Sequence, residues 1–202
     1  MICVIDYGMG NLRSVSKAIE KVGGQVKISA EPMDIEKADK LVLPGVGAFG
    51  DGAEELRKRN LFEPLRQWLS GGRAFLGICL GMQLLFDESE ESPGVKGLGF
   101  FPGKVQRFLS RTAKIPHIGW NKVSFSSTIT TRFQGWPVKD YFYFVHSYYP
   151  VPQDKSIIQG ACEYEKEEFA AFIVKDAIWA SQFHPEKSQD AGLNLLKTFI
   201  TL

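Results

Sequence analysis

The segment FLGICLGMQLLF, residues 75–86, places a cysteine where an apolar run ends. Residues 74–79 have the continuous apolar pattern of a buried strand, and the residues that follow are good helix formers. Cys79 stands in a G-x-C-x-G frame, and glycines relieve crowding at a sharp turn from strand to helix. Such a turn exposes its central residue at the carboxyl edge of an open sheet, where α/β proteins bind ligands. The segment therefore predicts a nucleophilic thiol, with a buried core cysteine as the alternative.

The predicted turn also supplies electrostatic help for a thiol. A cysteine at the start of a helix faces the positive end of the helix dipole, which favours the thiolate. The backbone N–H of Leu80 points at the same place and is suited to donate to an oxyanion.

The order of patterns along the chain predicts one α/β domain over residues 1–202. Strand-like segments alternate with helical ones in the first half, and the second half, from Gly97 to about Pro185, is rich in strands and turns. The fold class is therefore α/β, an open, mostly parallel central sheet flanked by helices, with additional antiparallel strands in the second half. Expected strands are 2–6, 26–29, 40–45 and 74–79, and expected helices are 11–22, 51–70 with a break near Pro64, one from residue 80 to about 90, and 189–202.

Composition excludes several classes of function. The chain has 44% hydrophobic and 23% charged residues and a net charge of +1, which is ordinary for a globular protein. It has no basic block for nucleic acid, no long apolar stretch for a membrane and no signal-peptide pattern at its start, so we expect a cytoplasmic protein. The three cysteines are far apart and lack structural-zinc spacing, so we expect neither a disulfide framework nor a metal site.

A cysteine nucleophile needs a base, and three histidines are available. His184 lies at the end of a strand-like run, and Pro185 biases it toward an extended conformation. Residues two apart on an extended chain point the same way, so Glu186 is placed to orient the imidazole. This predicts a Cys79–His184–Glu186 triad. The alternative interpretations are a surface turn at H-P-E, a partly buried polar residue at His146, and a loop histidine without chemistry at His117.

At this point the motifs carry a close resemblance to a known family. G-I-C-L-G-M-Q at 77–83, F-H-P-E at 183–186 and P-G-V-G at 44–47 resemble the nucleophile, His/Glu and oxyanion segments of triad-type (class I) glutamine amidotransferases, which have a flavodoxin-like fold. Further segments resemble the glutaminase subunits of imidazole glycerol phosphate synthases, and the resemblance spans residues 2–202. These further segments are D-Y-G-M-G-N-L-R-S-V at 6–15, I-P-H-I-G-W-N at 115–121, Y-F-V-H-S-Y-Y at 143–149 and P-E-K-S at 185–188.

The resemblance implies hydrolysis of glutamine to glutamate and ammonia through a glutamyl thioester on Cys79. His184 would move the proton and Glu186 would hold the imidazole. It implies no cofactor. It also implies an oxyanion hole from Gly45, Val46, Gly47 and Leu80, and contacts to glutamine from Gln83, Ser147 and Tyr148.

The resemblance further implies a partner. The ammonia would pass through a channel to a (β/α)8-barrel cyclase subunit, which forms imidazole glycerol phosphate and an aminoimidazole carboxamide ribotide in histidine biosynthesis. The two chains would form a heterodimer, with the P-H-I-G-W-N segment as an interface loop, because a Trp on a loop tends to need burial. The alternative is that Trp120 folds back onto its own core. The interface residues would be Asn11, His117, Trp120, Tyr143, His146 and Lys187.

Three other functions compete with this interpretation. Glutaminases of pyridoxal phosphate synthase or anthranilate synthase would share the triad but differ at the G-M-G-N, P-H-I-G-W-N and P-E-K-S segments. A non-catalytic regulatory domain would have lost a triad residue, whereas all three are present. A stand-alone cysteine hydrolase would act without a partner and would give no reason for Trp120.

Overall fold

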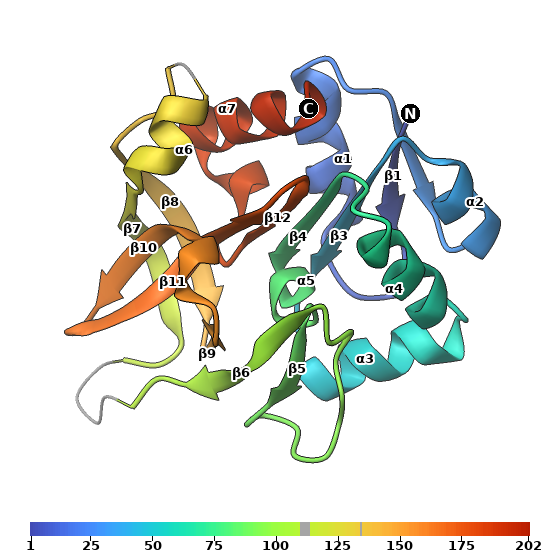
Figure 1. The fold of residues 1–202 in the computed structure, drawn as a ribbon, viewed down its shortest axis with the longest axis horizontal. Helices are drawn as coiled ribbons and strands as arrows, with labels where there is room; N and C mark the ends of the chain where they lie inside the picture. Colours follow the sequence, from blue (N-terminus) through green and yellow to red (C-terminus); the bar gives the residue numbers. More distant parts are fainter. Residues whose placement is uncertain (110–113, 134) are drawn as a thin grey trace.

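The computed structural model describes residues 1–109, 114–133 and 135–202. Among these residues, a nine-stranded sheet runs through the molecule in the order β2-β1-β3-β4-β12-β11-β10-β7-β8 (Figure 1). The five strands from β2 to β12 pair in parallel, and the pairs from β12 to β8 are antiparallel. The strands are β1 (Ile2–Ile5), β2 (Val26–Ser29), β3 (Lys40–Gly45), β4 (Phe75–Cys79), β7 (His117–Phe125), β8 (Lys139–His146), β10 (Ile158–Tyr164), β11 (Glu167–Lys175) and β12 (Ile178–Ser181).

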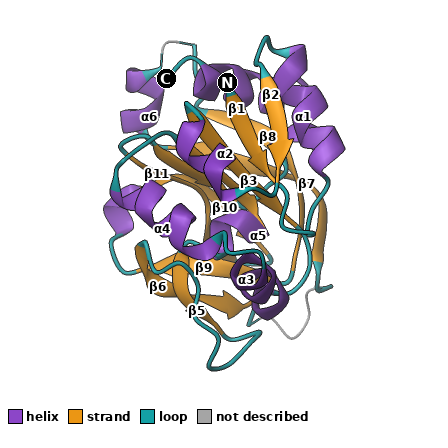
Figure 2. Ribbon diagram, turned by 90° about the vertical axis from the view of Figure 1, so that its right-hand side faces the viewer, coloured by secondary structure: helices purple, strands orange, loops and turns teal. Residues whose placement is uncertain are grey.

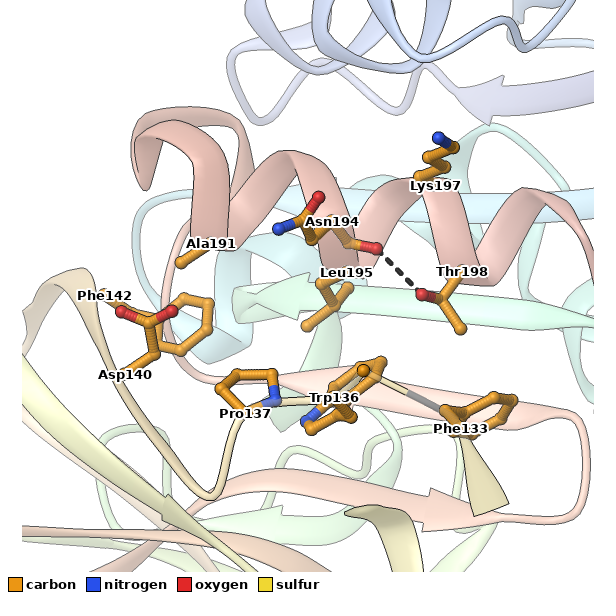
Figure 3. Close-up of a pocket in the computed structure, with 11 residues that line it drawn as sticks. Phe133, Trp136, Pro137, Asp140, Phe142, Ala191, Asn194, Leu195, Lys197 and Thr198 are labelled. Atoms are coloured by element: carbon orange, nitrogen blue, oxygen red, sulfur yellow. Dashed lines mark hydrogen bonds between the residues drawn. The ribbon is translucent and has the colours of Figure 1, made fainter. Parts of the chain in front are cut away.

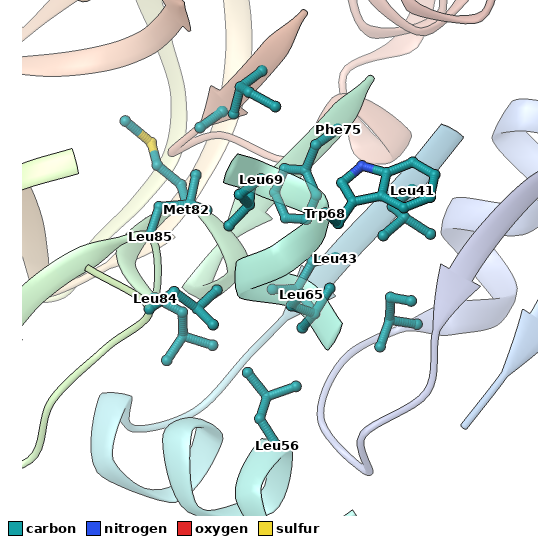
Figure 4. Packing of buried hydrophobic residues seen from close by; sticks show 14 of the residues in the cluster. Leu41, Leu43, Leu56, Leu65, Trp68, Leu69, Phe75, Met82, Leu84 and Leu85 are labelled. Atoms are coloured by element: carbon teal, nitrogen blue, oxygen red, sulfur yellow. The ribbon is translucent and has the colours of Figure 1, made fainter. Parts of the chain in front are cut away.

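Helices cover both faces of the parallel half, which is why its central strands are apolar throughout (Figure 1, Figure 2). Leu41 and Leu43 point to the face covered by α3 and α4, whereas Val42 points to the face covered by α1 and α7. Figure 4 shows the first of these clusters, with Trp68 and Phe75 among leucines of the strands and helices. The helices are α1 (Leu12–Lys21), α2 (Pro32–Lys37), α3 (Phe49–Lys58), α4 (Phe62–Ser70), α5 (Leu80–Gln83), α6 (Ser127–Arg132) and α7 (Gln189–Ile200), with 3-10 turns at Lys155–Ile157 and Pro185–Lys187.

A smaller sheet of β5 (Phe86–Ser89), β6 (Phe101–Arg107) and β9 (Tyr148–Pro152) lies beside α3, at the bottom of Figure 2. β9 begins two residues after β8 ends, so one continuous segment crosses from the large sheet to the small one. This segment lies next to the carboxyl edge of β4, since the carbonyl oxygen of Val145 is 3.9 Å from Sγ of Cys79, the last residue of that strand.

The predicted fold class is confirmed, since the parallel strands of the first half and the antiparallel strands of the second half form one mixed sheet. One predicted helix is wrong. The helix expected from residue 80 to about 90 ends at Gln83, and β5 follows it. The backbone N–H groups of Leu98 and Phe100 bond to the carbonyls of Leu84 and Leu85, which a longer helix would have used.

Other boundaries differ in smaller ways. The break expected near Pro64 lies at residues 59–61, and Pro64 sits in the first turn of α4, where a missing N–H costs little. The short helices α2 and α6 were not predicted from the sequence. Among the described residues, no helix has the length and apolar character to cross a membrane.

Candidate active site

Cys79 is the last residue of β4 and has φ +55° and ψ −108°, a conformation that residues with a Cβ seldom adopt. The strand therefore turns sharply into α5 at the cysteine, as the sequence predicted. The side chain is 5% exposed. A strained turn at a buried strand end is the geometry of a nucleophile elbow, so both the strain and the position favour a reactive role for the thiol.

The two glycines of the frame allow β4, α5 and β3 to approach one another. A Cβ on Gly81 would lie 1.8 Å from the carbonyl oxygen of Leu43, and a Cβ on Gly77 would lie 2.7 Å from the carbonyl oxygen of Gly81. Neither position has room for a side chain. The G-x-C-x-G frame is thus required by the close contact of backbones as well as by the turn itself.

His184 follows β12, the parallel neighbour of β4, and so reaches the same edge of the sheet as Cys79. Its Nδ1 lies 2.9 Å from Oε1 of Glu186, and the two side chains are 3% and 1% exposed. The predicted contact is therefore present, although its local structure differs from the prediction. His184 is extended, but Glu186 lies in a 3-10 turn that begins at Pro185, where proline is well suited.

The neighbours of His184 decide its charge. Burial lowers the pKa of His184, but its interactions with Cys79 and Glu186 outweigh burial and raise the pKa to about 10. Since Nδ1 faces Glu186, Nε2 is the ring nitrogen on the side of the thiol. The raised pKa therefore favours the imidazolium form of His184 in the folded protein.

Ser188 holds the histidine segment in place, and sequence reasoning gave it no role of its own. Its hydroxyl donates to the carbonyl of His184 at 2.6 Å and accepts from the backbone N–H of Tyr143 at 3.0 Å. The N–H of His184 in turn donates to the carbonyl of Tyr143 at 2.9 Å. The sequence signal for this role was a serine that directly follows the H-P-E-K run. Through Ser188, β8 holds the backbone of His184 in place.

A cavity of about 240 Å³ opens beside Cys79. Its lining includes these predicted residues: Val46 and Gly47 of the oxyanion loop, Leu80, Gln83, the pair Ser147 and Tyr148, and His146 of the predicted interface set. Gly45 pairs with Cys79 across β3 and β4, which brings the loop to the thiol. Glu91, which sequence reasoning missed within an acidic run, also lines the cavity and accepts from the N–H of Phe49 at 2.8 Å.

Two glutamine side chains join the wall of this cavity to the thiol. Gln83 is 5% exposed, and its Nε2 donates to the carbonyl of Tyr148 at 2.9 Å and to Oε1 of Gln182 at 3.2 Å. Gln182 is fully buried, and its Nε2 donates to Cys79 Sγ at 3.6 Å. Sequence reasoning missed Gln182, although a polar residue just before F-H-P-E in an apolar strand was a signal for it.

The predicted interface residues fall into two groups. Trp120 is 47% exposed and packs edge-on against Tyr143 with 6.2 Å between ring centroids, and Nζ of Lys187 lies 5.6 Å from the centroid of the same Tyr143 ring. These three form a surface cluster next to Glu186. Asn11 is exposed and caps α1 by accepting from the N–H of Ser14 at 3.2 Å.

His117 and His146 form the second group, and the structure corrects their predicted setting. The P-H-I-G-W-N segment is largely strand β7 rather than a loop. Both histidine side chains are buried, at 3% and 6% exposure, and they contact each other across β7 and β8. His146 also lines the cavity beside Cys79. The assignment of both histidines to a partner interface stays a prediction.

A second cavity, of about 220 Å³, lies away from the thiol between α7 and the segment around Trp136 (Figure 3). Phe133, Trp136 and Phe142 face Asn194 and Leu195 across it, and none of the predicted site residues lines it. In the part of the chain that the structure describes, no three His, Cys, Asp or Glu side chains are grouped closely enough to hold a metal ion.

Comparison with known proteins agrees with this geometry. Residues 3–201 match the family model described as "Glutamine amidotransferase class-I". The chain is 47% identical to the imidazole glycerol phosphate synthase subunit HisH of Syntrophotalea carbinolica, over 98% of each chain. It is 43% identical to the imidazole glycerol phosphate synthase hisHF of Schizosaccharomyces pombe, covering 100% of this chain and 38% of that one. A crystal structure described as a glutamine amidotransferase superposes over 100% of both chains with a TM-score of 0.73 at 18% identity, which supports the fold.

Proposed function

The chain belongs to the class-I glutamine amidotransferases, among the HisH subunits of imidazole glycerol phosphate synthase, and we propose that Cys79, His184 and Glu186 are its catalytic triad. It is the glutaminase subunit of that synthase and acts in histidine biosynthesis. The observation that carries the triad is the strained Cys79 at the carboxyl end of β4, with the His184–Glu186 pair at the end of the neighbouring strand.

The proposed reaction begins with attack of the Cys79 sulfur on the side-chain amide carbon of glutamine. His184 takes the thiol proton and gives it to the leaving nitrogen, so that ammonia departs and a glutamyl thioester remains. Water then adds to the thioester carbon, His184 accepts one of its protons and returns it to sulfur, and glutamate is released. Glu186 keeps Nδ1 of His184 protonated throughout, through the contact at 2.9 Å.

The negative charge on the amide oxygen needs donors placed in advance. We assign them to the N–H of Leu80 and an N–H of the Gly45–Val46–Gly47 loop, because these groups and the thiol share one cavity wall. Gly47 has φ +110°, so the loop adopts a conformation that a side chain would resist. The half-exposed Val46 leaves its peptide room to rotate.

The α-amino and α-carboxylate groups of glutamine are assigned to the Ser147–Tyr148 side of the cavity. The carbonyl of Tyr148 is held by Gln83, so this segment has a fixed backbone. Glu91 is the carboxylate that lines the cavity and is suited to an ammonium group. We therefore assign the amino group of glutamine to the Glu91 side of the cavity and its α-carboxylate to the Ser147–Tyr148 backbone.

We propose a (β/α)8-barrel cyclase subunit as the partner and one amidotransferase domain over residues 1–202. The hisHF relative of Schizosaccharomyces pombe, whose name joins hisH and hisF, matches this chain over 38% of its own length, which supports association of the two subunits. Free ammonia is mostly protonated near neutral pH and is then no nucleophile, so a shielded path to the second active site is a chemical requirement. The Trp120, Tyr143 and Lys187 cluster next to Glu186 is the surface on this chain that best fits the exit of that path.

The direct test is ammonia release from glutamine by the wild type and by Cys79→Ala, each alone, with a cyclase subunit, and with the cyclase and its nucleotide ligand. We expect a large rise with the loaded cyclase in the wild type and none in Cys79→Ala. Full activity without a partner would favour a stand-alone hydrolase. Activity that persists in Cys79→Ala would refute the assigned nucleophile.

A further inference from the structure

A chain of hydrogen bonds leads from two buried histidines to the glutamine cavity. His117 and His146 are register partners on β7 and β8, so their side chains lie opposite each other on the same face. Nδ1 of His117 is 3.1 Å from Nε2 of His146, and Nδ1 of His146 is 2.9 Å from the carbonyl oxygen of Tyr148. Neither ring takes part in the proposed chemistry, yet the last acceptor of the chain belongs to a residue that lines the cavity.

The chemistry of the acceptor fixes the direction of every bond in the chain. A carbonyl oxygen only accepts, so Nδ1 of His146 carries its hydrogen. Burial lowers the pKa of His146 to about 3 and that of His117 to about 4, so each ring is neutral near pH 7 and has one N–H. Nε2 of His146 is then an acceptor and Nδ1 of His117 is its donor. Nε2 of His117 accepts in turn from Nδ2 of Asn121 at 3.3 Å.

The carbonyl of Tyr148 joins this chain to the thiol. It accepts from His146 and also from Nε2 of Gln83 at 2.9 Å. Gln83 donates onward to Gln182 at 3.2 Å, and Gln182 donates to Cys79 Sγ at 3.6 Å. One backbone carbonyl is therefore fixed from two sides, by the histidine pair and by the glutamine pair.

Ring packing prevents the histidines from turning to other partners. His117 stacks on Tyr164 with 4.1 Å between ring centroids and on Phe144 with 4.9 Å. His146 lies 5.2 Å from Phe108 and 5.1 Å from Phe169. A histidine that only filled the core would be replaceable by a hydrophobic ring, whereas these two present a defined N–H to a defined carbonyl.

We propose that His146, held in one tautomer by His117, is a positioning residue that fixes the Ser147–Tyr148 backbone in the geometry that binds the α groups of glutamine. This inference rests on the proposed function and adds two residues to it. It assigns no proton transfer to either histidine.

Three variants of the full chain separate positioning from packing. His146→Phe keeps a ring in the core and removes both nitrogens. His146→Asn keeps an N–H donor near the place of Nδ1. Tyr164→Phe is the matched control, because it lies in the same ring cluster and loses only its hydrogen bond to the carbonyl of Lys114 at 2.8 Å.

Each variant is assayed for kcat and KM with glutamine in complex with the cyclase subunit. Cys79 is also alkylated with 6-diazo-5-oxo-L-norleucine, which has the α groups of glutamine, and with iodoacetamide, which lacks them. For His146→Phe we expect KM to rise about tenfold, as for one lost buried hydrogen bond, with kcat changed by less than about threefold. Alkylation by the glutamine analogue slows by about the same factor, and alkylation by iodoacetamide stays within about twofold. His146→Asn restores KM to within about threefold of the wild type, and Tyr164→Phe leaves both reagents unaffected.

The positioning role would be overturned if His146→Phe kept the wild-type KM and the wild-type rate of alkylation by the glutamine analogue. It would also be overturned if Tyr164→Phe changed KM as much as His146→Phe does, or if His146→Phe slowed alkylation by iodoacetamide as much as alkylation by the analogue. If His146→Phe does not fold, His117→Phe keeps a ring beside Tyr164 and removes the donor to His146 together with the acceptor of Asn121, whose Nδ2 still donates to the carbonyl of Glu163. The same split between the two reagents then decides the matter. A wild type that releases no ammonia from glutamine and resists the analogue would refute the proposed function itself, and the positioning role with it.

Discussion

Replacing Gly81 by alanine tests whether the contact between α5 and β3 holds the nucleophile turn. The added Cβ would lie 1.8 Å from the carbonyl oxygen of Leu43 and 2.9 Å from its carbonyl carbon. Real contacts of this kind stay beyond 3.0 Å. The two backbones must therefore separate by more than 1 Å, and no flexible side chain is available to yield instead.

The cost follows from this displacement. Overpacking of a core costs about 1–3 kcal/mol, and a backbone contact belongs at the upper end. For a chain of this length, each kcal/mol lowers Tm by about 2–4 °C, so we expect a fall of about 6–12 °C. Leu43 precedes the oxyanion loop by two residues in β3, and a misplacement of about 1 Å in an active site reduces catalysis about a hundredfold.

Thermal unfolding and ammonia release in the presence of the cyclase measure both effects. Gly71→Ala is the matched control, because Gly71 has φ −75° at the end of α4 and its Cβ would meet only ordinary contacts, the nearest at 3.4 Å. We expect Gly71→Ala to keep wild-type activity and nearly wild-type Tm. Equal Tm values for Gly81→Ala and Gly71→Ala, with wild-type ammonia release in both, would refute the reasoning.

The raised pKa of His184 predicts a loss of stability on the alkaline side, because the folded protein favours the charged form of the imidazole more than the unfolded chain does. The free energy of unfolding should therefore fall as pH rises from about 6.5 to about 10. Urea unfolding of His184→Gln should show a free energy that changes less with pH over this range. The lowered pKa of His146 has the opposite sign, so the free energy of unfolding should fall as pH drops from 6.5 toward about 3, and an unchanged acid profile in His146→Phe would contradict this. Ser188→Ala leaves the partly buried N–H of Tyr143 without its acceptor, which should lower the free energy of unfolding by about 1–3 kcal/mol and reduce kcat. Thr198→Ala removes only an exposed hydrogen bond to the carbonyl of Asn194 and should change the free energy of unfolding by about 0.5 kcal/mol or less.

The strand pattern and the cysteine frame were predictable because both depend on neighbours in the chain. β3 was predicted with the observed bounds of residues 40–45, since an apolar run that ends in glycine indicates a buried strand and its turn. Cys79 was placed at a strand end for the same reason, and the structure gives it φ +55° there. The His184–Glu186 contact was predicted from spacing, although its local structure is a 3-10 turn rather than an extended chain.

The sequence could not decide the features that depend on distant backbone groups. The helix at residues 80–90 has good local propensity, yet residues 98–101 take its carbonyls and β5 forms instead. His117 and His146 are 29 positions apart, and only the register of β7 with β8 turns two candidate interface residues into one buried pair. Gln182 reaches the thiol from 103 positions away because β12 lies beside β4. Local sequence thus determined the nucleophile and the strands that carry it, whereas the tertiary structure decided which buried polar groups face each other, because each such group takes its partner from whatever strand packs next to it.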